Sequence, residues 1–217
     1  MCGRFTLTLD IDRVARAFRV EPSVQAQPRY NIAPTQDVVT VMRNGSAHLD
    51  ILRWGLIPSW AKEESIGSRM INARAETLAE KPSFKRLLSS RRCLIVADGF
   101  YEWKEENRAK TPMYITLKDQ EPFAFAGLWD AWKSPDGYTL RTCTIITTQP
   151  NELLSTIHNR MPAILARDAQ EDWLDPAMKD VEVAQHLLTP YPTEEMIARP
   201  VSRLVNNPKY DSAELLA

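Results

Sequence analysis

The apolar residues of this chain are grouped in short, strand-sized runs separated by polar turns. Runs rich in β-branched and aromatic residues are typical of β-strands. The connecting stretches 104–111 and 133–137 are short and polar, which favours antiparallel pairing of the strands that they join. No run approaches the ~18 apolar residues of a membrane-spanning helix. The strands predicted in this way are Cys93–Ala97, Met113–Leu117, Phe123–Trp129 and Arg141–Thr148.

Further segments complete a mixed α+β pattern. Asn44-Gly45 lies between two strand-like segments and is a strong signal for a β-hairpin. Asp10 is placed to cap a helix over Asp10–Val20. No repeat or linker divides the chain, so we expect one α+β domain over residues 1–217. The remaining predictions are hairpin strands Asp37–Arg43 and Ala47–Trp54, helices Pro82–Ser90, Asn151–Ile157, Asp168–Leu174 and Lys179–Leu188, a short strand Met161–Leu165, a rigid loop Arg29–Pro34 and an extended tail at Arg199–Val201.

Charge and composition exclude some classes of protein. The 27 Lys and Arg residues are balanced by 28 Asp and Glu residues, which excludes a broadly basic nucleic-acid binder but not a local basic groove. Hydrophobic residues make up 44% and charged residues 25% of the chain, as in folded globular proteins. The N-terminal sequence has no apolar stretch typical of a signal peptide. We therefore expect a soluble, cytoplasmic protein.

The cysteines exclude two kinds of structural support. Cys2, Cys93 and Cys143 are odd in number, widely spaced and without a CxxC pair, which excludes a disulfide framework and a structural zinc site. Cys93 and Cys143 lie in apolar strands, where we expect them to be small core residues. No clustered metal ligands, P-loop or GxGxxG motif are present in the sequence. No metal and no cofactor are therefore expected.

Cys2 is the most informative residue, because removal of Met1 would make it the N-terminal residue. An α-amine has a pKa of about 7.7–8.0, so a useful fraction is neutral and nucleophilic near neutral pH. A 1,2-aminothiol condenses with an aldehyde to a Schiff base, and its thiol then closes a thiazolidine ring. The same residue could hydrolyse an amide with its own amine as base. The alternative is a cysteine that lies near the chain end by chance.

Glu102 and His158 are candidates for proton transfer. Glu102 lies between aromatic residues after a buried strand, where loss of water would suit its carboxyl group to general acid–base work. The alternative for Glu102 is a solvent-facing position on an alternating strand. His48 and His186 are expected at the surface. His158 adjoins an arginine and a proline-fixed turn, and is the best acid–base candidate of the three histidines.

The segment Ile71–Thr77 alternates polar and small residues without a helical period. In an extended backbone, Asn72, Arg74 and Glu76 would share one face. An amide beside a guanidinium can hold a phosphate or orient a reacting group. Structural hydrogen bonding is an equally reasonable interpretation.

Six segments follow one another along the chain: MCGR, RYNIAPTQ, WGLIPSWAK, INARAET, ADGFYEWK and HNRMP, with PVSRLVNN as a weaker seventh. In this order they resemble the SRAP (SOS-response-associated peptidase) family of abasic-site processing proteins, and the resemblance covers the chain from Cys2 to about Asn207. Single segments of this kind would be weak signals, whereas six in order are specific.

The resemblance implies a mostly antiparallel, barrel-like β core flanked by helices. It also implies that Cys2, after Met1 removal, forms a covalent thiazolidine crosslink with an abasic site in single-stranded DNA, protecting the lesion during the DNA damage response. Strand incision by β-elimination from the Schiff base would be an associated lyase activity. The family's catalytic positions match Cys2, Asn72, Glu102 and His158. Its DNA contacts match Arg4, Arg74 and Arg160 on phosphates, with Asn31, Pro34 and Thr147 lining the channel.

Two alternatives to the crosslinking enzyme remain open. The first is a thiol peptidase, acting on other chains or on Met1 alone, with Cys2 as nucleophile. The second is a non-catalytic protein that shields single-stranded DNA. We expect abasic single-stranded DNA as the partner, a monomeric protein, no membrane association, and nucleoid association in a bacterial cell. Binding to undamaged DNA should be modest and salt-sensitive, because few phosphates are neutralised.

Overall fold

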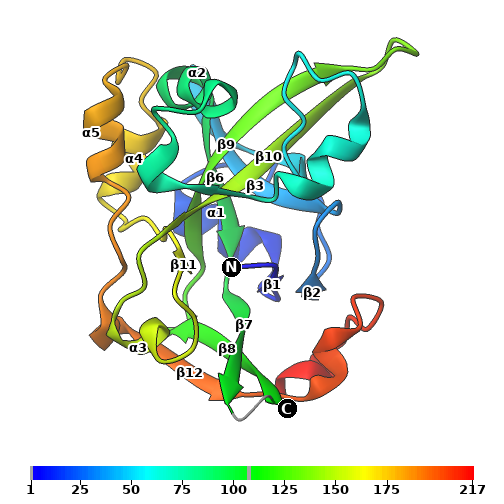
Figure 1. Ribbon diagram of the computed structural model, residues 1–217, viewed down its shortest axis with the longest axis vertical. Helices are drawn as coiled ribbons and strands as arrows, with labels where there is room; N and C mark the ends of the chain where they lie inside the picture. The colour runs from blue at the N-terminus through cyan, green and yellow to red at the C-terminus, as the bar shows by residue number, and fades with distance from the viewer. Residues whose placement is uncertain (1, 107–108) are drawn as a thin grey trace.

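The computed structural model describes residues 2–106 and 109–217 (Figure 1). Its α-helices are α1 (Ile11–Phe18), α2 (Pro82–Ser90), α3 (Glu152–Ser155), α4 (Ala169–Leu174) and α5 (Val181–His186). Its strands are β1 (Arg4–Leu7), β2 (Arg29–Ile32), β3 (Asp37–Asn44), β4 (Ser46–Trp54), β5 (Asn72–Arg74), β6 (Arg92–Ala97), β7 (Gly99–Glu106), β8 (Ala109–Leu117), β9 (Phe123–Lys133), β10 (Thr139–Thr148), β11 (Met161–Pro162) and β12 (Met196–Pro200). Short 3₁₀ helices lie at Glu64–Arg69, Ala75–Thr77, Thr193–Glu195, Arg203–Asn206 and Ala213–Leu216.

Five strands close a barrel. The ring runs β10–β4–β3–β6–β9 and returns from β9 to β10. Its pairs are antiparallel except β10–β4, and β5 adds a second parallel partner to β10. The predicted hairpin is confirmed, because β3 and β4 pair from Asp37 opposite Arg53 to Asn44 opposite Ser46 around Gly45, whose φ of +77° suits a glycine. The predicted α+β fold with a mostly antiparallel, barrel-like core is therefore confirmed.

A second sheet, in the order β12–β8–β7–β1–β2, carries the N-terminal strand. Its pairs are antiparallel, with Arg4 opposite Tyr101 and Thr6 opposite Gly99 between β1 and β7. In Figure 1, β1 lies near the middle of the molecule, between the barrel and the β7–β8 pair. The N-terminal strand is therefore held where the two sheets meet.

Aromatic packing joins the two sheets. The Phe5 ring of β1 lies 5.2 Å from the Trp54 ring and 5.6 Å from the Phe125 ring, both of which belong to barrel strands. Aromatic pairs at such separations add to the stabilisation from apolar burial. Trp54 is fully buried, and so are Cys93 and Cys143, as predicted for the two cysteines. The same core that closes the barrel thus fixes the strand that follows Cys2.

Asp98 secures the junction between β1 and β7. Its carboxylate accepts hydrogen bonds from the Thr6 hydroxyl (2.5 Å), the Thr8 backbone N–H (2.5 Å) and hydroxyl (2.7 Å), and the Leu9 N–H (3.1 Å). Gly99 must lack a side chain here, because an added Cβ would lie 2.3 Å from the Tyr114 hydroxyl. These contacts set the register that carries Glu102 along β7.

Two local predictions are wrong and one is incomplete. The expected loop at Arg29–Pro34 begins with β2, because β1 pairs with it and the Asp211 carboxylate accepts its backbone N–H groups. The tail predicted to be extended contains the extended strand β12, but its pairing with β8 was not predicted. The expected extended face over Ile71–Thr77 is shared only by Asn72 and Arg74, because the backbone turns into a 3₁₀ helix at Ala75.

Several predicted boundaries also change. The helices predicted near residues 168–174 and 179–188 are confirmed in shorter form as α4 and α5, with Asp168 and Asp180 as caps. The predicted turn over 104–111 is shorter, since β7 continues to Glu106 and β8 begins at Ala109; residues 107 and 108 lie outside the described part.

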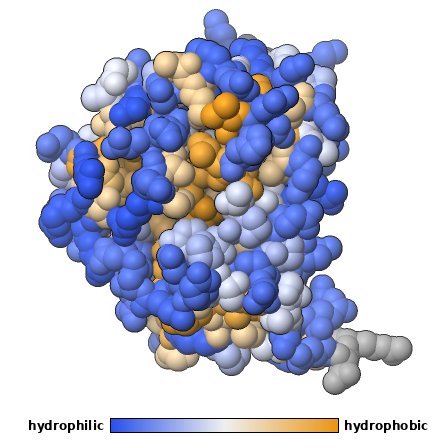
Figure 2. Space-filling model, turned by 90° about the vertical axis from the view of Figure 1, so that its left-hand side faces the viewer, coloured by the Kyte–Doolittle hydropathy of each residue, from blue (hydrophilic) through white to orange (hydrophobic). Residues whose placement is uncertain are grey.

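Seen from the side that carries α4 and α5, the surface is mainly hydrophilic, with apolar side chains gathered in a central strip (Figure 2). Within the described residues, none of the helices has the length and apolar character needed to cross a membrane.

Candidate active site

Cys2 lies directly before β1 and is fully buried. Its thiol donates a weak hydrogen bond to the Arg4 carbonyl, with Sγ and O separated by 3.8 Å. Burial raises the pKa of the Cys2 thiol well above its usual range, and the Glu102 carboxylate raises this pKa further. Cys2 is therefore a neutral thiol at physiological pH. The predicted removal of Met1 concerns a residue outside the described part of the chain.

Asn72 holds the backbone of Cys2. It begins β5, and its Nδ2 donates to the Cys2 carbonyl oxygen at 2.8 Å. Pairing of β5 with β10, in which Asn72 lies opposite Ile145, ties this amide to the barrel wall. The Asn72 Oδ1 atom is buried and has no hydrogen-bond partner among the described residues. A buried acceptor without a partner calls for an explanation, and a ligand donor would provide one.

Glu102 and His158 meet in one pocket. Glu102 is 2% exposed and extends from β7, whereas His158 follows α3. Both line a pocket of about 650 Å³ that opens to solvent. Because Glu102 also interacts electrostatically with the Cys2 thiol, it connects the buried N-terminal segment to this pocket. The remaining lining residues are Trp103, Glu105, Lys110, Ile157 and Asn159.

The turn around His158 is fixed from both sides. The His158 backbone N–H donates to the Leu154 carbonyl at 2.7 Å, which ends α3. The Arg160 backbone N–H donates to His158 Nδ1 at 3.1 Å. A neutral imidazole whose Nδ1 accepts a hydrogen bond carries its proton at Nε2. The ring is therefore oriented as a donor at Nε2.

Arg160 follows this turn, and its side chain is largely buried. Its side chain is 11% exposed, and its guanidinium donates to the Thr147 carbonyl at 2.6 Å and to both carboxylate oxygens of Glu76 at 2.6 and 2.9 Å. Thr147 itself is fully buried in β10, opposite Arg74 of β5. Arg74 is exposed. The predicted contacts Arg74, Thr147 and Arg160 thus form one contiguous group.

Arg4 and Asn31 form a different group, which faces the C-terminal segment. The Arg4 guanidinium donates to Asn31 Oδ1 at 2.8 Å and to the Val205 carbonyl at 2.7 Å. The Asn31 amide donates to the carbonyls of Val205, Asn207 and Tyr210. Because Asn31 is fully buried by these contacts, a direct contact with DNA would require the C-terminal segment to move.

Pro34 lies apart from both groups, half-buried beside Thr35, whose φ of +71° places it in the left-handed region. Cys2, Asn72, Glu102 and His158 lie in one region, linked by successive contacts. Arg74 lies two residues after Asn72 on β5, opposite Thr147, whose carbonyl accepts a hydrogen bond from Arg160. Arg4 and Asn31 lie outside this region, because their side chains are hydrogen-bonded to the C-terminal segment.

Two features escaped the sequence analysis. Trp103 and Lys110 line the pocket from the β7–β8 pair, but a polar turn beside an aromatic segment gives no signal for this. The partner of Arg160 is 84 residues away in the chain, so no spacing rule could have identified Glu76.

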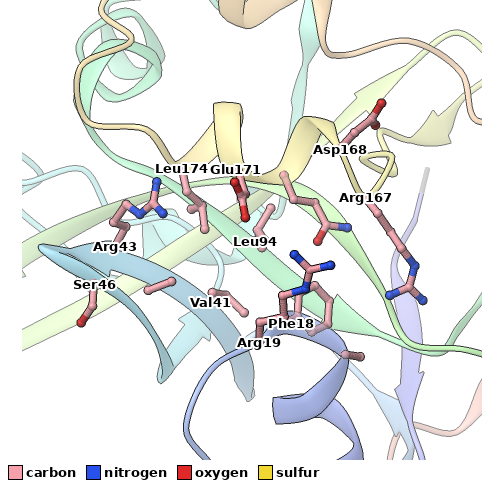
Figure 3. A pocket seen from close by; sticks show the side chains of 13 residues that line it. Phe18, Arg19, Val41, Arg43, Ser46, Leu94, Arg167, Asp168, Glu171 and Leu174 are labelled. Atoms are coloured by element: carbon pink, nitrogen blue, oxygen red, sulfur yellow. The ribbon is translucent and has the colours of Figure 1, made fainter.

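A pocket of larger volume lies elsewhere. It has a volume of about 760 Å³, lies between the end of α1, the β3–β4 hairpin, β6 and α4, and contains no predicted site residue (Figure 3). Side chains from Phe18, Arg43 and Glu171 line it. Volume alone therefore does not identify the site. Across residues 2–106 and 109–217, no group of His, Cys, Asp and Glu side chains could hold a metal ion.

The structure thus joins a buried cysteine near the chain start to an amide that holds its carbonyl and to a carboxylate that shares a pocket with an imidazole. The chain belongs to the SRAP family, because the family model "SOS response associated peptidase (SRAP)" matches residues 1–208.

Relatives and solved structures agree with this assignment. The chain is 52% identical to abasic site processing protein YoqW of Bacillus subtilis, over 100% of this chain and 99% of that protein. It is 32% identical to abasic site processing protein HMCES of Xenopus tropicalis, over 100% of this chain and 78% of that protein. A crystal structure of a protein from Bacteroides thetaiotaomicron superposes with a TM-score of 0.90 at 30% identity, covering 99% of this chain and 98% of the other.

Proposed function

We propose that this protein recognises abasic sites in single-stranded DNA and attaches itself covalently to them through Cys2. Membership of the SRAP family and similarity to proteins named for abasic site processing support the substrate. The grouping of Cys2, Asn72, Glu102 and His158 supports the chemistry. No cofactor is part of the proposal.

The proposed reaction needs only the protein, water and the lesion. Hydrolysis of the Met1–Cys2 bond first frees the α-amine of Cys2. This amine adds to the C1′ aldehyde of the ring-opened sugar, and loss of one water gives a Schiff base. The thiol then adds across the C=N bond, its sulfur bonding to C1′ and its proton passing to nitrogen. The product is a thiazolidine with the mass of protein plus DNA minus one water.

Each residue has a task that its contacts support. The Asn72 amide orients the Cys2 backbone through its carbonyl. Glu102 accepts and returns the protons that leave the amine and thiol, since a positioned carboxyl group accelerates such transfers by about 10²–10⁴-fold. His158, with its proton at Nε2, donates to the sugar oxygen as the ring opens. Arg74 and Arg160 bind neighbouring phosphates.

The observation that carries the proposal is the 2.8 Å hydrogen bond from Asn72 to the Cys2 carbonyl. It fixes the backbone of Cys2, rather than its thiol alone, beside Glu102. A peptidase that used only the thiol would gain little from this bond, whereas a reaction that starts at the α-amine depends on where that backbone lies.

The test is the intact mass of the protein after incubation with single-stranded DNA that carries one abasic site. The free-protein mass reports whether Met1 is absent. We expect a heat-stable adduct of protein plus DNA minus water, and none with Cys2→Ala. A protein that lacks Met1 yet forms no adduct would contradict the proposal.

The same experiment separates the alternatives. A non-catalytic DNA-binding protein would bind equally well with Cys2→Ala and form no adduct in either case. A thiol peptidase would cleave peptide substrates without an adduct on DNA. Strand incision that survives in Cys2→Ala would show that the α-amine alone supports β-elimination.

A further inference from the structure

The exposed carboxylate of Glu76 occupies the guanidinium of Arg160. The two oxygens and the two Nη atoms form a paired contact at 2.6 and 2.9 Å. Glu76 is thereby kept ionised, because the hydrogen bond from Arg160 lowers the pKa of its carboxyl group. A phosphate oxygen pair presents the same geometry to an arginine as a carboxylate does. Glu76 therefore fills the position that a DNA phosphate would take.

Arg160 and Glu76 differ in how firmly the rest of the protein holds their side chains. The Arg160 side chain is 11% exposed and is also bonded to the Thr147 carbonyl, so it is part of the barrel wall. The Glu76 side chain is 43% exposed and lies in a short 3₁₀ turn. If the pair opens, the carboxylate is the side that moves, and the arginine stays bonded to the Thr147 carbonyl with the donors that Glu76 leaves.

Glu76 also lies within electrostatic reach of Arg74. One acidic side chain therefore faces two arginines of the proposed phosphate-binding group. Only the Glu76 side of this pair is well exposed, so a phosphate that displaces the carboxylate releases Glu76 to solvent and offers Arg160 an oxygen pair of the same geometry.

We propose that Glu76 is a specificity-determining residue that competes with DNA phosphate for Arg160 and so weakens binding to DNA without a reactive lesion. The inference rests on the proposed function, because it takes Arg160 as a phosphate ligand. In free protein Glu76 holds Arg160; on DNA a phosphate replaces it. Undamaged DNA must displace the carboxylate and gains no covalent bond in return, whereas an abasic site is captured covalently after the same displacement.

The test compares Glu76→Gln with the unchanged protein. Two labelled oligonucleotides serve as probes: undamaged single-stranded DNA, and the same DNA with a tetrahydrofuran abasic analogue, which has no aldehyde and cannot crosslink. We expect Glu76→Gln to bind both about two- to fivefold more tightly, because the ion pair that competes with the phosphate for Arg160 is lost. Undamaged DNA should then inhibit crosslinking to true abasic DNA at lower concentrations.

The matched control is Glu121→Gln. Glu121 is similarly exposed (38%) and pairs with Arg13, outside the proposed site. This variant removes one negative charge and should report only the general electrostatic effect. The sharper control is the background Arg160→Ala, in which Glu76→Gln should change affinity no more than Glu121→Gln does.

Three results would overturn the inference: affinity that does not exceed the Glu121→Gln control, a gain that persists with Arg160→Ala, or weaker binding by Glu76→Gln. Thermal unfolding checks that each variant is folded; if Glu76→Gln is not, Glu76→Asp, which keeps the charge but shortens the reach, carries the same expectation. If the unchanged protein forms no adduct with abasic DNA, the proposed function fails whatever the affinities. If it forms one and the affinities do not shift, only the role of Glu76 fails.

Discussion

Two buried carboxylates, Asp98 just before β7 and Glu102 within β7, have opposite surroundings. Asp98 is 7% exposed, and its hydrogen bonds come from residues at the end of β1. Glu102 is 2% exposed, yet it borders an open pocket with His158 and interacts with the Cys2 thiol. Burial does not distinguish them. What distinguishes them is whether the neighbours are fixed backbone donors or groups that can react.

The comparison gives a rule for this fold. A carboxylate that gathers several backbone N–H groups is committed to structure, since those donors have no other acceptor. A carboxylate beside a thiol, an imidazole and a pocket is placed for proton transfer. A substitution of Glu102 should therefore change the crosslinking rate, whereas a substitution of Asp98 should change the free energy of unfolding.

The largest effect is expected for Glu102→Gln. The amide keeps the shape of the side chain but cannot take up a proton, so the crosslinking rate should fall by about 10²–10³-fold. Stability in urea should change by less than about 1 kcal/mol. Alkylation of Cys2 should be no slower than in the unchanged protein, because Glu102 raises the pKa of the thiol. A crosslinking rate within about twofold of the original would place Glu102 with Asp98 as a structural carboxylate.

Asp98→Ala should act on stability instead. The change leaves the Thr8 and Leu9 N–H groups without their acceptor, at a cost of about 3 kcal/mol in the free energy of unfolding. Asp98→Asn can keep a carbonyl toward these donors and should recover part of the loss. Urea unfolding measures the effect, and the folded fraction should crosslink at nearly the original rate. Loss of rate without loss of stability would reverse the assignment.

The Asp98 region should also respond to alkaline pH. Burial, and secondarily the charge of Asp98, raise the pKa of the Tyr114 hydroxyl. A raised folded-state pKa gives stability that is present below the unfolded tyrosine pKa of about 10 and is lost as the pH rises above it. Tyr114→Phe should reduce this loss by about 1.4 kcal/mol per pH unit.

Urea unfolding of Tyr114→Phe between about pH 9 and pH 11 measures the slope. At neutral pH the variant should cost about 1 kcal/mol, because the 3.0 Å hydrogen bond to Thr6 is lost. If the free energy of unfolding falls with pH at the same slope in the variant and in the unchanged protein, Tyr114 has the same pKa in the folded and unfolded states.

The strands could be predicted where the apolar residues and the turn residues of the segment itself indicate them. The apolar runs and Asn44-Gly45 predicted the barrel strands, because period and turn chemistry act over a few residues. β2 was missed, since its backbone donors meet Asp211, about 180 residues along the chain. β12 was missed because its partner is β8. Strands defined by distant partners leave little trace in their own residues.

The site was predictable in its residue types but not in its connections. Cys2 was singled out by its position, and Glu102 and His158 by their neighbours, whereas Asn72 became a catalytic candidate through the family resemblance. That Asn72 bonds the Cys2 carbonyl follows only from the pairing of β5 with β10. The four catalytic assignments stay predictions, which the variants above test.

The smallest effect is expected for Asn72. Asn72→Ala removes one hydrogen bond to the Cys2 carbonyl, worth about 1 kcal/mol, so crosslinking should slow by about fivefold while stability changes little. Asn72→Asp should be slower still, because a carboxylate cannot donate and would repel the carbonyl oxygen. Single-turnover crosslinking at saturating protein isolates this step from DNA binding. If Asn72→Ala weakens DNA binding but leaves the single-turnover rate unchanged, the amide serves the DNA rather than the cysteine, and its buried Oδ1 marks where that contact is made.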